Sequence, residues 1–328
     1  MPNLQLTIAC GPYDRMEGIR TGAVQIEGID ATYLAIQSPP EIFARMIKTR
    51  AFDVSEMSLS SYLSLRSRGE FPFIALPVFP SRVFRHGNIF INRRAGIERP
   101  QDLNGKRVGT FGYRQTASVW IRGILAHEYD VEPGSMRWVE GGQDTPWQAD
   151  SDQQAKPIRG IHLERAPEHA SLSEMLAKGE IDALIGARIP PSLGNCTDVA
   201  RLFPNYRQVE RDYFKRTGIF PIMHTLVIRE DLYRAKPWIG VSLYKALVAS
   251  KELALREMRF SGAMRYMLPW LYDEIEEVDE LFGGDPMPYG LEPNRSVLET
   301  FARYLAAQAF VDRQIAVDEF FVPIVAEK

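Results

Sequence analysis

FPSRVFRHGNIFIN, residues 79–92, places cationic side chains directly before a short run of alternating apolar residues. The polar side chains of this stretch include those of Ser81, Arg82, Arg85 and His86. A second stretch, TFGYRQTASVWIRG (residues 110–123), places polar side chains between a predicted strand and a predicted helix. Arginines, an imidazole and unpaired backbone amides at a helix N-terminus are well suited to binding carboxylates. The two stretches therefore predict a receptor for a small molecule that bears carboxylate groups.

The chain on both sides of these stretches alternates predicted strands with predicted helices. Apolar runs predict strands at residues 4–10, 26–35, 52–57, 73–78, 106–111, 136–139, 181–186 and 219–229. Helical spacing predicts helices at residues 41–50, 117–129, 171–179, 238–259, 263–273 and 296–310. The helix at 171–179 begins with Ser171 and Glu174 in the spacing of a capping box. Strands that alternate with helices are typical of the α/β class.

The order of these elements predicts two α/β lobes that form a hinged clamshell. We assign residues 1–91 and 221–328 to a discontinuous first lobe with a helical C-terminal region, and residues 92–220 to a second lobe. Ligands of open α/β sheets bind beyond the carboxyl ends of the strands, so we expect a ligand in the cleft between the lobes. The longest predicted loop covers residues 141–159.

Composition excludes several classes of partner. The formal net charge of −3 argues against a nucleic-acid partner, which would require a basic face. No apolar run reaches the ~18 residues that a membrane helix needs. The N-terminus MPNLQLTIACG has neither a basic region nor a sustained apolar region, so we expect a cytoplasmic protein. The two cysteines, Cys10 and Cys196, are interpreted as reduced thiols.

The familiar signatures of catalysis and cofactor binding are absent from the sequence. It contains no G-x-S-x-G, H-E-x-x-H, Walker or G-x-G-x-x-G motif and no paired C-x-x-C. We therefore predict no cofactor and no metal. A metal site built from His86, His224 and Asp285 remains an alternative.

The candidate residues also have ordinary structural interpretations. His224 lies within an apolar strand, where a histidine is often a hydrogen-bonded core residue. His86 stands among arginines, which would lower its pKa, or it caps a loop. Tyr113 would by default be a packing aromatic, and Glu56 and Asp285 turn or cap residues.

Six strings of the sequence resemble those of the 4,5-dihydroxyphthalate decarboxylase family. They are GPYDR (11–15), SEMSLSSY (55–62), FPSRVFRHGNIFIN (79–92), GYRQTASVWIRG (112–123), TGIFPIMHTLVIR (217–229) and DPMPYGLEPNR (285–295). This resemblance, which extends almost from end to end, implies a cytoplasmic protein with the periplasmic-binding-protein type II fold, whose mixed sheets are flanked by helices. It also implies a carboxy-lyase that acts on 4,5-dihydroxyphthalate, or on a closely related hydroxylated aromatic acid. The products would be protocatechuate and CO2, in a step of phthalate degradation.

The implied reaction needs a base at the phenol, an acid over the carbon that loses CO2, and cations on the remaining carboxylate. As proton carriers we predict His224, which delivers the proton, and His86, which orients the substrate. Tyr113, Glu56 or Asp285 would act at the hydroxyl end. The predicted substrate-binding residues are Ser81, Arg82, Arg85, Tyr113, Arg114, Thr116 and Arg188.

Two other classes of function compete with an enzyme. A solute-binding protein of the ABC-transporter type, specific for an aromatic carboxylate, would use the same arginines and aromatics without reacting. A ligand-sensing regulator would need a DNA-binding helix pair, for which the sequence gives no signal. The two histidines and the N-terminus favour the enzyme. The expected partner is a small aromatic dicarboxylate, and the chain length is compatible with a homo-oligomer.

Overall fold

The computed structural model describes residues 2–69, 71–147, 158, 160–312 and 315–324. The chain divides into two compact units, each with its own sheet. The first unit consists of Met1–Arg82, Ile222–Glu299 and Ile315–Lys328, and the second consists of Val83–Pro221 and Thr300–Gln314.

These bounds differ from the predicted lobes at residues 83–91 and 300–314, and also at Pro221, which belongs to the second unit. Residues 83–91 belong to the second unit because strand β5 (Ile89–Asn92) pairs with two strands of the second sheet. Residues 300–314 also belong there, because the second half of helix α10 (Arg295–Ala307) packs Phe301 and Tyr304 against Trp120.

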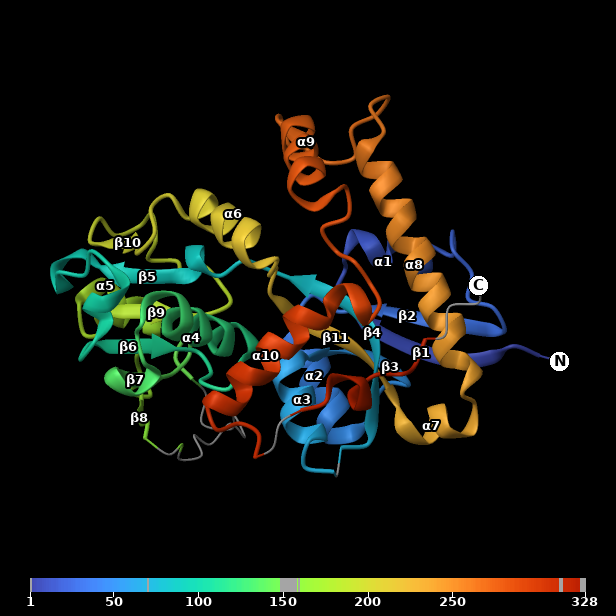
Figure 1. The fold of residues 1–328 in the computed structure, drawn as a ribbon, viewed down its shortest axis with the longest axis horizontal. Helices are drawn as coiled ribbons and strands as arrows, with labels where there is room; N and C mark the ends of the chain where they lie inside the picture. The colour runs from blue at the N-terminus through green and yellow to red at the C-terminus, as the bar shows by residue number, and fades with distance from the viewer. Residues whose placement is uncertain (1, 70, 148–157, 159, 313–314, 325–328) are drawn as a thin grey trace. The chain divides into compact units, whose positions relative to one another are not determined.

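The first unit is built on a mixed five-stranded sheet in the order β2-β1-β3-β11-β4 (Figure 1). Its strands are β1 (Leu4–Cys10), β2 (Ile29–Ala35), β3 (Val54–Ser58), β4 (Phe73–Arg82) and β11 (Ile222–Arg229). Its helices include α1 (Asp14–Thr21), α2 (Pro39–Thr49), α3 (Leu59–Arg66), α7 (Glu230–Ala235), α8 (Trp238–Arg259) and α9 (Leu271–Phe282). β11 runs antiparallel to both of its neighbours, whereas β1 is parallel to β2 and β3.

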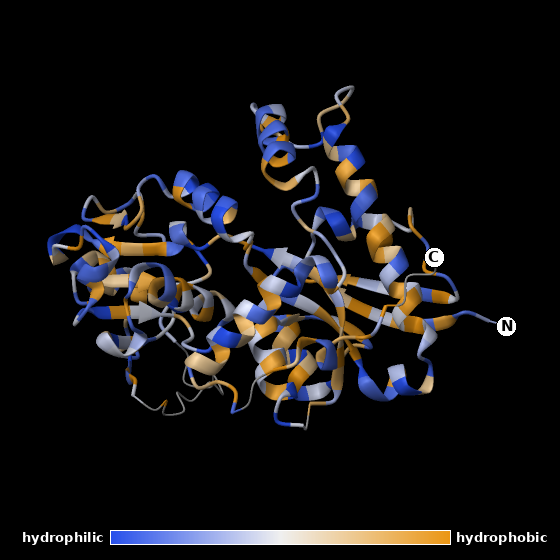
Figure 2. Ribbon diagram, in the orientation of Figure 1, coloured by the Kyte–Doolittle hydropathy of each residue, from blue (hydrophilic) through white to orange (hydrophobic). Residues whose placement is uncertain are grey.

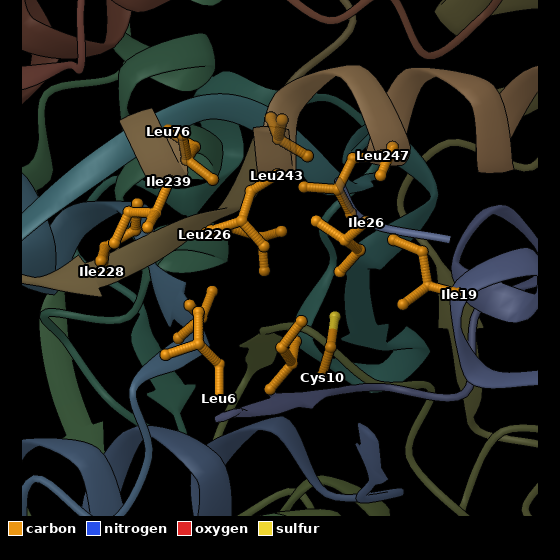
Figure 3. Packing of buried hydrophobic residues seen from close by; sticks show 14 of the residues in the cluster. Leu6, Cys10, Ile19, Ile26, Leu76, Leu226, Ile228, Ile239, Leu243 and Leu247 are labelled. Carbon is orange, nitrogen blue, oxygen red and sulfur yellow. The ribbon is translucent and has the colours of Figure 1, made fainter. Parts of the chain in front are cut away.

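Helix α8 covers one face of this sheet with an apolar stripe. Ile239, Leu243 and Leu247 recur at intervals of four residues and therefore lie on one side of the helix. Figure 3 shows these side chains directed toward strand residues such as Leu6 and Leu226. Each buried aliphatic side chain stabilises the fold by about 1.5–3 kcal/mol, so this interface contributes strongly to the stability of the unit.

The second unit contains a mixed six-stranded sheet in the order β10-β5-β9-β6-β7-β8. Its remaining strands are β6 (Arg107–Thr110), β7 (Arg137–Glu140), β8 (His162–Arg165), β9 (Ala183–Ile185) and β10 (Val199–Arg201). Its helices include α4 (Thr116–Tyr129), α5 (Leu172–Lys178), α6 (Tyr206–Thr217) and the short η1 (His86–Asn88). Apolar residues concentrate along the strands, as in β5 (Figure 2). Among the described residues, no helix is both long and apolar enough to cross a membrane.

Several predicted elements are confirmed and one is wrong. The predicted strand at 4–10 and helix at 238–259 have the same bounds in the structure, and Ser171 and Glu174 form the predicted capping box. The helix predicted at 263–273 is instead α9, which begins only at Leu271. Pro269 explains the difference, because the residue before a proline avoids the helical conformation. Of the predicted loop at 141–159, residues 148–157 and 159 lie outside the described residues.

Candidate active site

His224 and Glu56 form a hydrogen-bonded pair in the first unit. Strand β11 aligns His224 with Ser58 of β3, and it aligns Leu226 with Glu56. The imidazole and the carboxylate are therefore diagonal neighbours on adjacent strands, within reach of long side chains. Nδ1 of His224 lies 2.6 Å from Oε1 of Glu56. The histidine side chain is 18% exposed and the glutamate side chain 0%, so only the imidazole reaches the surface.

The carboxylate of Glu56 accepts hydrogen bonds from groups on three segments. Besides His224, the phenol of Tyr13 donates to Oε1 over 2.7 Å. The backbone N–H of Gly11 donates to Oε2 over 2.9 Å, and the thiol of Cys10 lies 3.5 Å from the same oxygen. Burial raises the pKa of Glu56, but His224 and these donors outweigh it and hold the pKa below its usual value.

This arrangement fixes the tautomer of His224. An ionised carboxylate can only accept hydrogen bonds, so Nδ1 of His224 must carry a proton and donate it. Nε2 is then the ring nitrogen that exchanges a proton with a bound molecule. The phenyl ring of Phe43 packs edge-on against the imidazole at a centroid distance of 5.0 Å and restricts its rotation. The pair can deliver or remove a proton in a fixed direction.

Serine hydroxyls flank His224 on both neighbouring strands. Ser58 of β3 and Ser81 of β4 are each aligned with His224 across the sheet. Residues aligned on antiparallel strands project to the same face. The hydroxyl of Ser58 also lies 3.2 Å from that of Ser60. Ser81, predicted to bind substrate, therefore lies beside the predicted proton donor.

The surroundings of Glu56 do not favour the role predicted for it at the substrate hydroxyl. It is fully buried, and its oxygens already accept hydrogen bonds from protein groups. Asp285, the other carboxylate predicted there, pairs with Nζ of the buried Lys251 and accepts a hydrogen bond from the N–H of Met287. Asp285 therefore anchors the segment before α10, which its default interpretation as a turn residue anticipates.

Arg82 and Arg85 are buried, which the sequence interpretation did not anticipate. The guanidinium of Arg82 donates to Asn294 and to the carbonyl of Pro288 in the first unit. Arg85 donates to the carbonyl of Ala187 in the second unit. Burial lowers the pKa of each arginine to about 10. Both arginines brace chain segments within their own units.

His86 lies in an aromatic cluster of the second unit and is only 1% exposed. The rings of Tyr129, Phe203 and Tyr213 surround it at centroid distances of 6.1, 5.5 and 5.1 Å. Burial, followed by the charge of Arg216, lowers its pKa to about 4. The predicted direction of the shift is confirmed, but burial is the main cause. This environment fits a core histidine rather than one that orients substrate.

The candidates from the second stretch lie near the start of α4. Tyr113 is 1% exposed, and its ring packs 3.6 Å from the guanidinium carbon of the fully buried Arg122. Thr116 is buried as the first residue of α4. Arg114 is exposed, with its guanidinium 4.8 Å from the ring of Phe310. Arg114 thus presents a cation near the carboxyl end of β6.

Arg188 is the other exposed arginine among the candidates. It follows β9 in the second unit and forms an ion pair of 3.1 Å with Asp144. A surface pair of this kind contributes at most about 1 kcal/mol, so an anionic ligand can compete for the guanidinium.

The alternative metal site is not present in the described part of the chain. There, no group of three His, Cys, Asp or Glu side chains is arranged to hold a metal ion. His224 and Asp285 belong to the first unit, and His86 belongs to the second.

Two curated proteins identify the family. A 4,5-dihydroxyphthalate decarboxylase of Comamonas testosteroni is 38% identical over 328 residues, which cover 98% of this chain and 98% of that protein. The chain belongs to the 4,5-dihydroxyphthalate decarboxylase family. A second 4,5-dihydroxyphthalate decarboxylase, from Pseudomonas putida, is 43% identical over 190 residues, covering 58% of this chain and 73% of that protein. The predicted family and its carboxy-lyase class are thereby confirmed. No protein-family model matches the chain.

A solved structure confirms the predicted fold of this decarboxylase family member. The periplasmic aliphatic sulphonate binding protein SsuA of Escherichia coli superposes with a TM-score of 0.55 at 9% identity, covering 97% of each chain. At this identity the likeness concerns the fold alone. Together with the two mixed sheets, it establishes an α/β fold like that of periplasmic binding proteins.

The site prediction for this decarboxylase family member did not include Tyr13, Cys10 or Arg122. Tyr13 lies in the string GPYDR, which helped to identify the family, but it is not among the predicted site residues. The order of the strands brings Cys10 and Tyr13 to Glu56, and strand order cannot be deduced from local patterns. Arg122 is not among the predicted site residues either; it is fully buried and donates to Gln308 and to the carbonyl of Tyr113.

Proposed function

We propose that the protein catalyses the decarboxylation of 4,5-dihydroxyphthalate to protocatechuate and CO2. The names of its two curated relatives support this substrate. The observation that carries the proposal is the pair of His224 and buried Glu56, whose Nδ1–Oε1 distance is 2.6 Å. A carboxylate-bound imidazole with one edge toward the surface is a suitable acid for protonating an aromatic ring.

The proposed chemistry follows from the ring pattern of the substrate. Each carboxylate is para to a hydroxyl. Transfer of the phenolic proton to water raises the electron density at the carbon that bears the carboxylate, and the phenolate oxygen takes a proton back once CO2 has left. His224, doubly protonated, donates its Nε2 proton to that carbon and forms the new C–H bond. The C–C bond to the carboxylate then breaks, its electron pair returns to the ring, and CO2 leaves. The ring itself accepts and returns the electrons, so the proposed route needs no cofactor.

Glu56 would make the proton donor effective. Its carboxylate faces Nδ1 and stabilises the imidazolium before the transfer. After the transfer it holds the neutral ring by the same hydrogen bond, so that Nε2 can take up the next proton. Glu56 thereby acts through His224 and does not itself contact the substrate.

Each predicted binding residue that stays near the surface is a separate candidate for substrate contact. The Ser81 hydroxyl flanks His224, and a side chain of this type can donate to a carboxylate. Arg114 and Arg188 are the exposed arginines among the predicted binding residues, and both belong to the second unit. An arginine that binds the spectator carboxylate should raise KM when replaced by glutamine, with little change in kcat.

The test is to incubate the protein with 4,5-dihydroxyphthalate and measure CO2 and protocatechuate together, with and without a chelator. We expect equal amounts of both products in either condition, and a loss of kcat of about 100-fold or more in His224→Gln. His169→Gln, which changes an exposed histidine, is the matched control. Tight binding without product would favour the solute-binding alternative. Release that requires an added divalent ion would refute the cofactor-free route.

Three further points belong to the same proposal. A role in phthalate degradation follows from the proposed substrate. Cytoplasmic localisation stays a prediction, which cell fractionation tests. A homo-oligomer would cover apolar side chains that the first unit exposes at Phe260, Met264, Met267, Leu268, Trp270 and Tyr272. Light scattering of the purified protein measures its mass.

A further inference from the structure

Tyr13 donates to the same carboxylate oxygen that binds His224. Its hydroxyl lies 2.7 Å from Oε1 of Glu56, and Nδ1 of His224 lies 2.6 Å from that atom. The chemistry described above does not use this phenol. We propose that Tyr13 is a positioning residue for the decarboxylation and acts through Glu56 on His224, an assignment that rests on the proposed function and deepens it.

The direction of both hydrogen bonds is determined by the groups that make them. Burial, and then the charge of Glu56, raises the pKa of Tyr13, so the phenol keeps its proton. Glu56 is ionised and can only accept. Oε1 therefore accepts from Tyr13 and from His224 at once. If Oε1 rotated away from the imidazole, Glu56 would also lose its charge-assisted hydrogen bond from Tyr13. The two bonds therefore hold the carboxylate in one orientation.

The turn that carries Tyr13 binds both oxygens of the carboxylate. Gly11 donates its backbone N–H to Oε2 over 2.9 Å while Tyr13 donates to Oε1. The N–H of Tyr13 donates to the carbonyl of Gly11 over 2.9 Å, which closes the turn. A Cβ atom at residue 11 would lie 2.7 Å from the Tyr13 ring, so only glycine allows this contact. The Arg15 guanidinium carbon covers the ring at 4.3 Å.

Loss of the phenol should therefore change proton transfer without changing the affinity for substrate. The hydroxyl is one of the groups that keep Glu56 ionised. Without it, Glu56 takes up a proton at higher pH and then no longer holds His224 in one tautomer. The groups that titrate or carry charge near this carboxylate are Cys10 of β1, Tyr13 and Arg15 at the start of α1, Tyr33 of β2 and His224 of β11.

The experiment compares Tyr13→Phe with Tyr33→Phe. Tyr13→Phe keeps the ring and removes only the hydroxyl that reaches Glu56. Tyr33→Phe is the matched control, because its hydroxyl donates over 3.0 Å to the carbonyl of Gly11 in the same turn. The measurements are kcat and KM across pH, and the ¹⁵N NMR shifts of the His224 ring across pH in the substrate-free protein, which report the ionisation of Glu56 through their hydrogen bond.

We expect Tyr13→Phe to lower kcat, leave KM unchanged, and move the acid-side loss of activity upward by about one to two pH units. The ring nitrogens of His224 should report the protonation of Glu56 at a correspondingly higher pH, and Tyr33→Phe should show neither effect. Installing 3-fluorotyrosine, a more acidic donor, at residue 13 should move the acid limb downward. This second probe applies even if Tyr13→Phe fails to fold.

Three results would overturn the role of Tyr13: an unchanged pH profile, a rise in KM alone, or an equal shift in Tyr33→Phe. A rise in KM alone would mean that the phenol contacts the substrate. A wild-type protein that releases no CO2 would instead remove the proposed function. The NMR titration, which needs no turnover, would then still decide whether Tyr13 controls Glu56 and His224.

Discussion

Replacing His86 by leucine should remove much of the acid sensitivity of the folded protein. Its pKa falls from 6.5 to about 4, mainly because the imidazole is buried. Among the described residues, neither ring nitrogen has a hydrogen-bond partner. Between these two pKa values the unfolded chain binds a proton that the folded chain does not. The free energy of unfolding therefore falls as pH falls through this window, by about 2 kcal/mol from pH 7 to pH 5.

Urea unfolding followed by tryptophan fluorescence measures this effect at several pH values. We expect the stability of His86→Leu to depend less steeply on pH, with the difference from wild type appearing below about pH 6.5 and levelling off near pH 4. His169→Leu changes an exposed histidine of the same unit and should leave the slope unchanged.

The prediction also concerns catalysis. Because His86 packs among aromatic rings, His86→Leu should keep nearly wild-type kcat at neutral pH. If the free energy of unfolding of His86→Leu depends on pH as steeply as that of wild type, protonating the buried imidazole does not destabilise the fold. That result would refute the reasoning from burial. A loss of kcat of about 100-fold in a folded variant would return His86 to the catalytic machinery.

Three other variants test the site and its support. Glu56→Gln should lower kcat by about 100-fold or more at constant KM, because an amide does not stabilise the His224 imidazolium; steady-state kinetics decide. Gly123→Ala should destabilise the protein by about 2 kcal/mol despite the helix preference of alanine, because the added methyl group overlaps the ring of Tyr304. Thermal unfolding measures this loss of stability. The double variant that also carries Tyr304→Ala should recover part of the lost stability. Asn294→Ala should cost about 4 kcal/mol in urea unfolding, because it removes the hydrogen bond from buried Arg82 and two bonds to carbonyl groups. Wild-type stability in that last variant would contradict a bracing role for the asparagine.

Elements with a strong local signal could be predicted from the sequence. The apolar stripe of α8 and the alternation of β1 gave the bounds that the structure has. The helix predicted at 263–273 failed because Pro269 interrupts a favourable apolar spacing. Family resemblance supplied the overall architecture, which no single local pattern determines.

The candidate site was predictable in residue type more than in arrangement. Glu56 and His224 were both named, but their partnership depends on β11 lying beside β3, which local patterns do not reveal. The arginine-rich stretch was expected to bind carboxylates, yet Arg82 and Arg85 are buried. A guanidinium serves equally well as a ligand for carboxylates or as a donor to backbone carbonyls, so only burial separates the two roles.

The position of β11 has a consequence for synthesis of the protein. β11 lies between β3 and β4, which are made much earlier, so the first sheet cannot close until residue 229 has been translated. All strands of the second sheet are made in the meantime. Glu56 precedes His224 by 168 residues, which corresponds to roughly 10–30 s of translation. During that interval the growing chain exposes unpaired strand edges of the kind that chaperones protect. It also lacks His224, the proposed proton donor, so the protein should become catalytically active only late in translation.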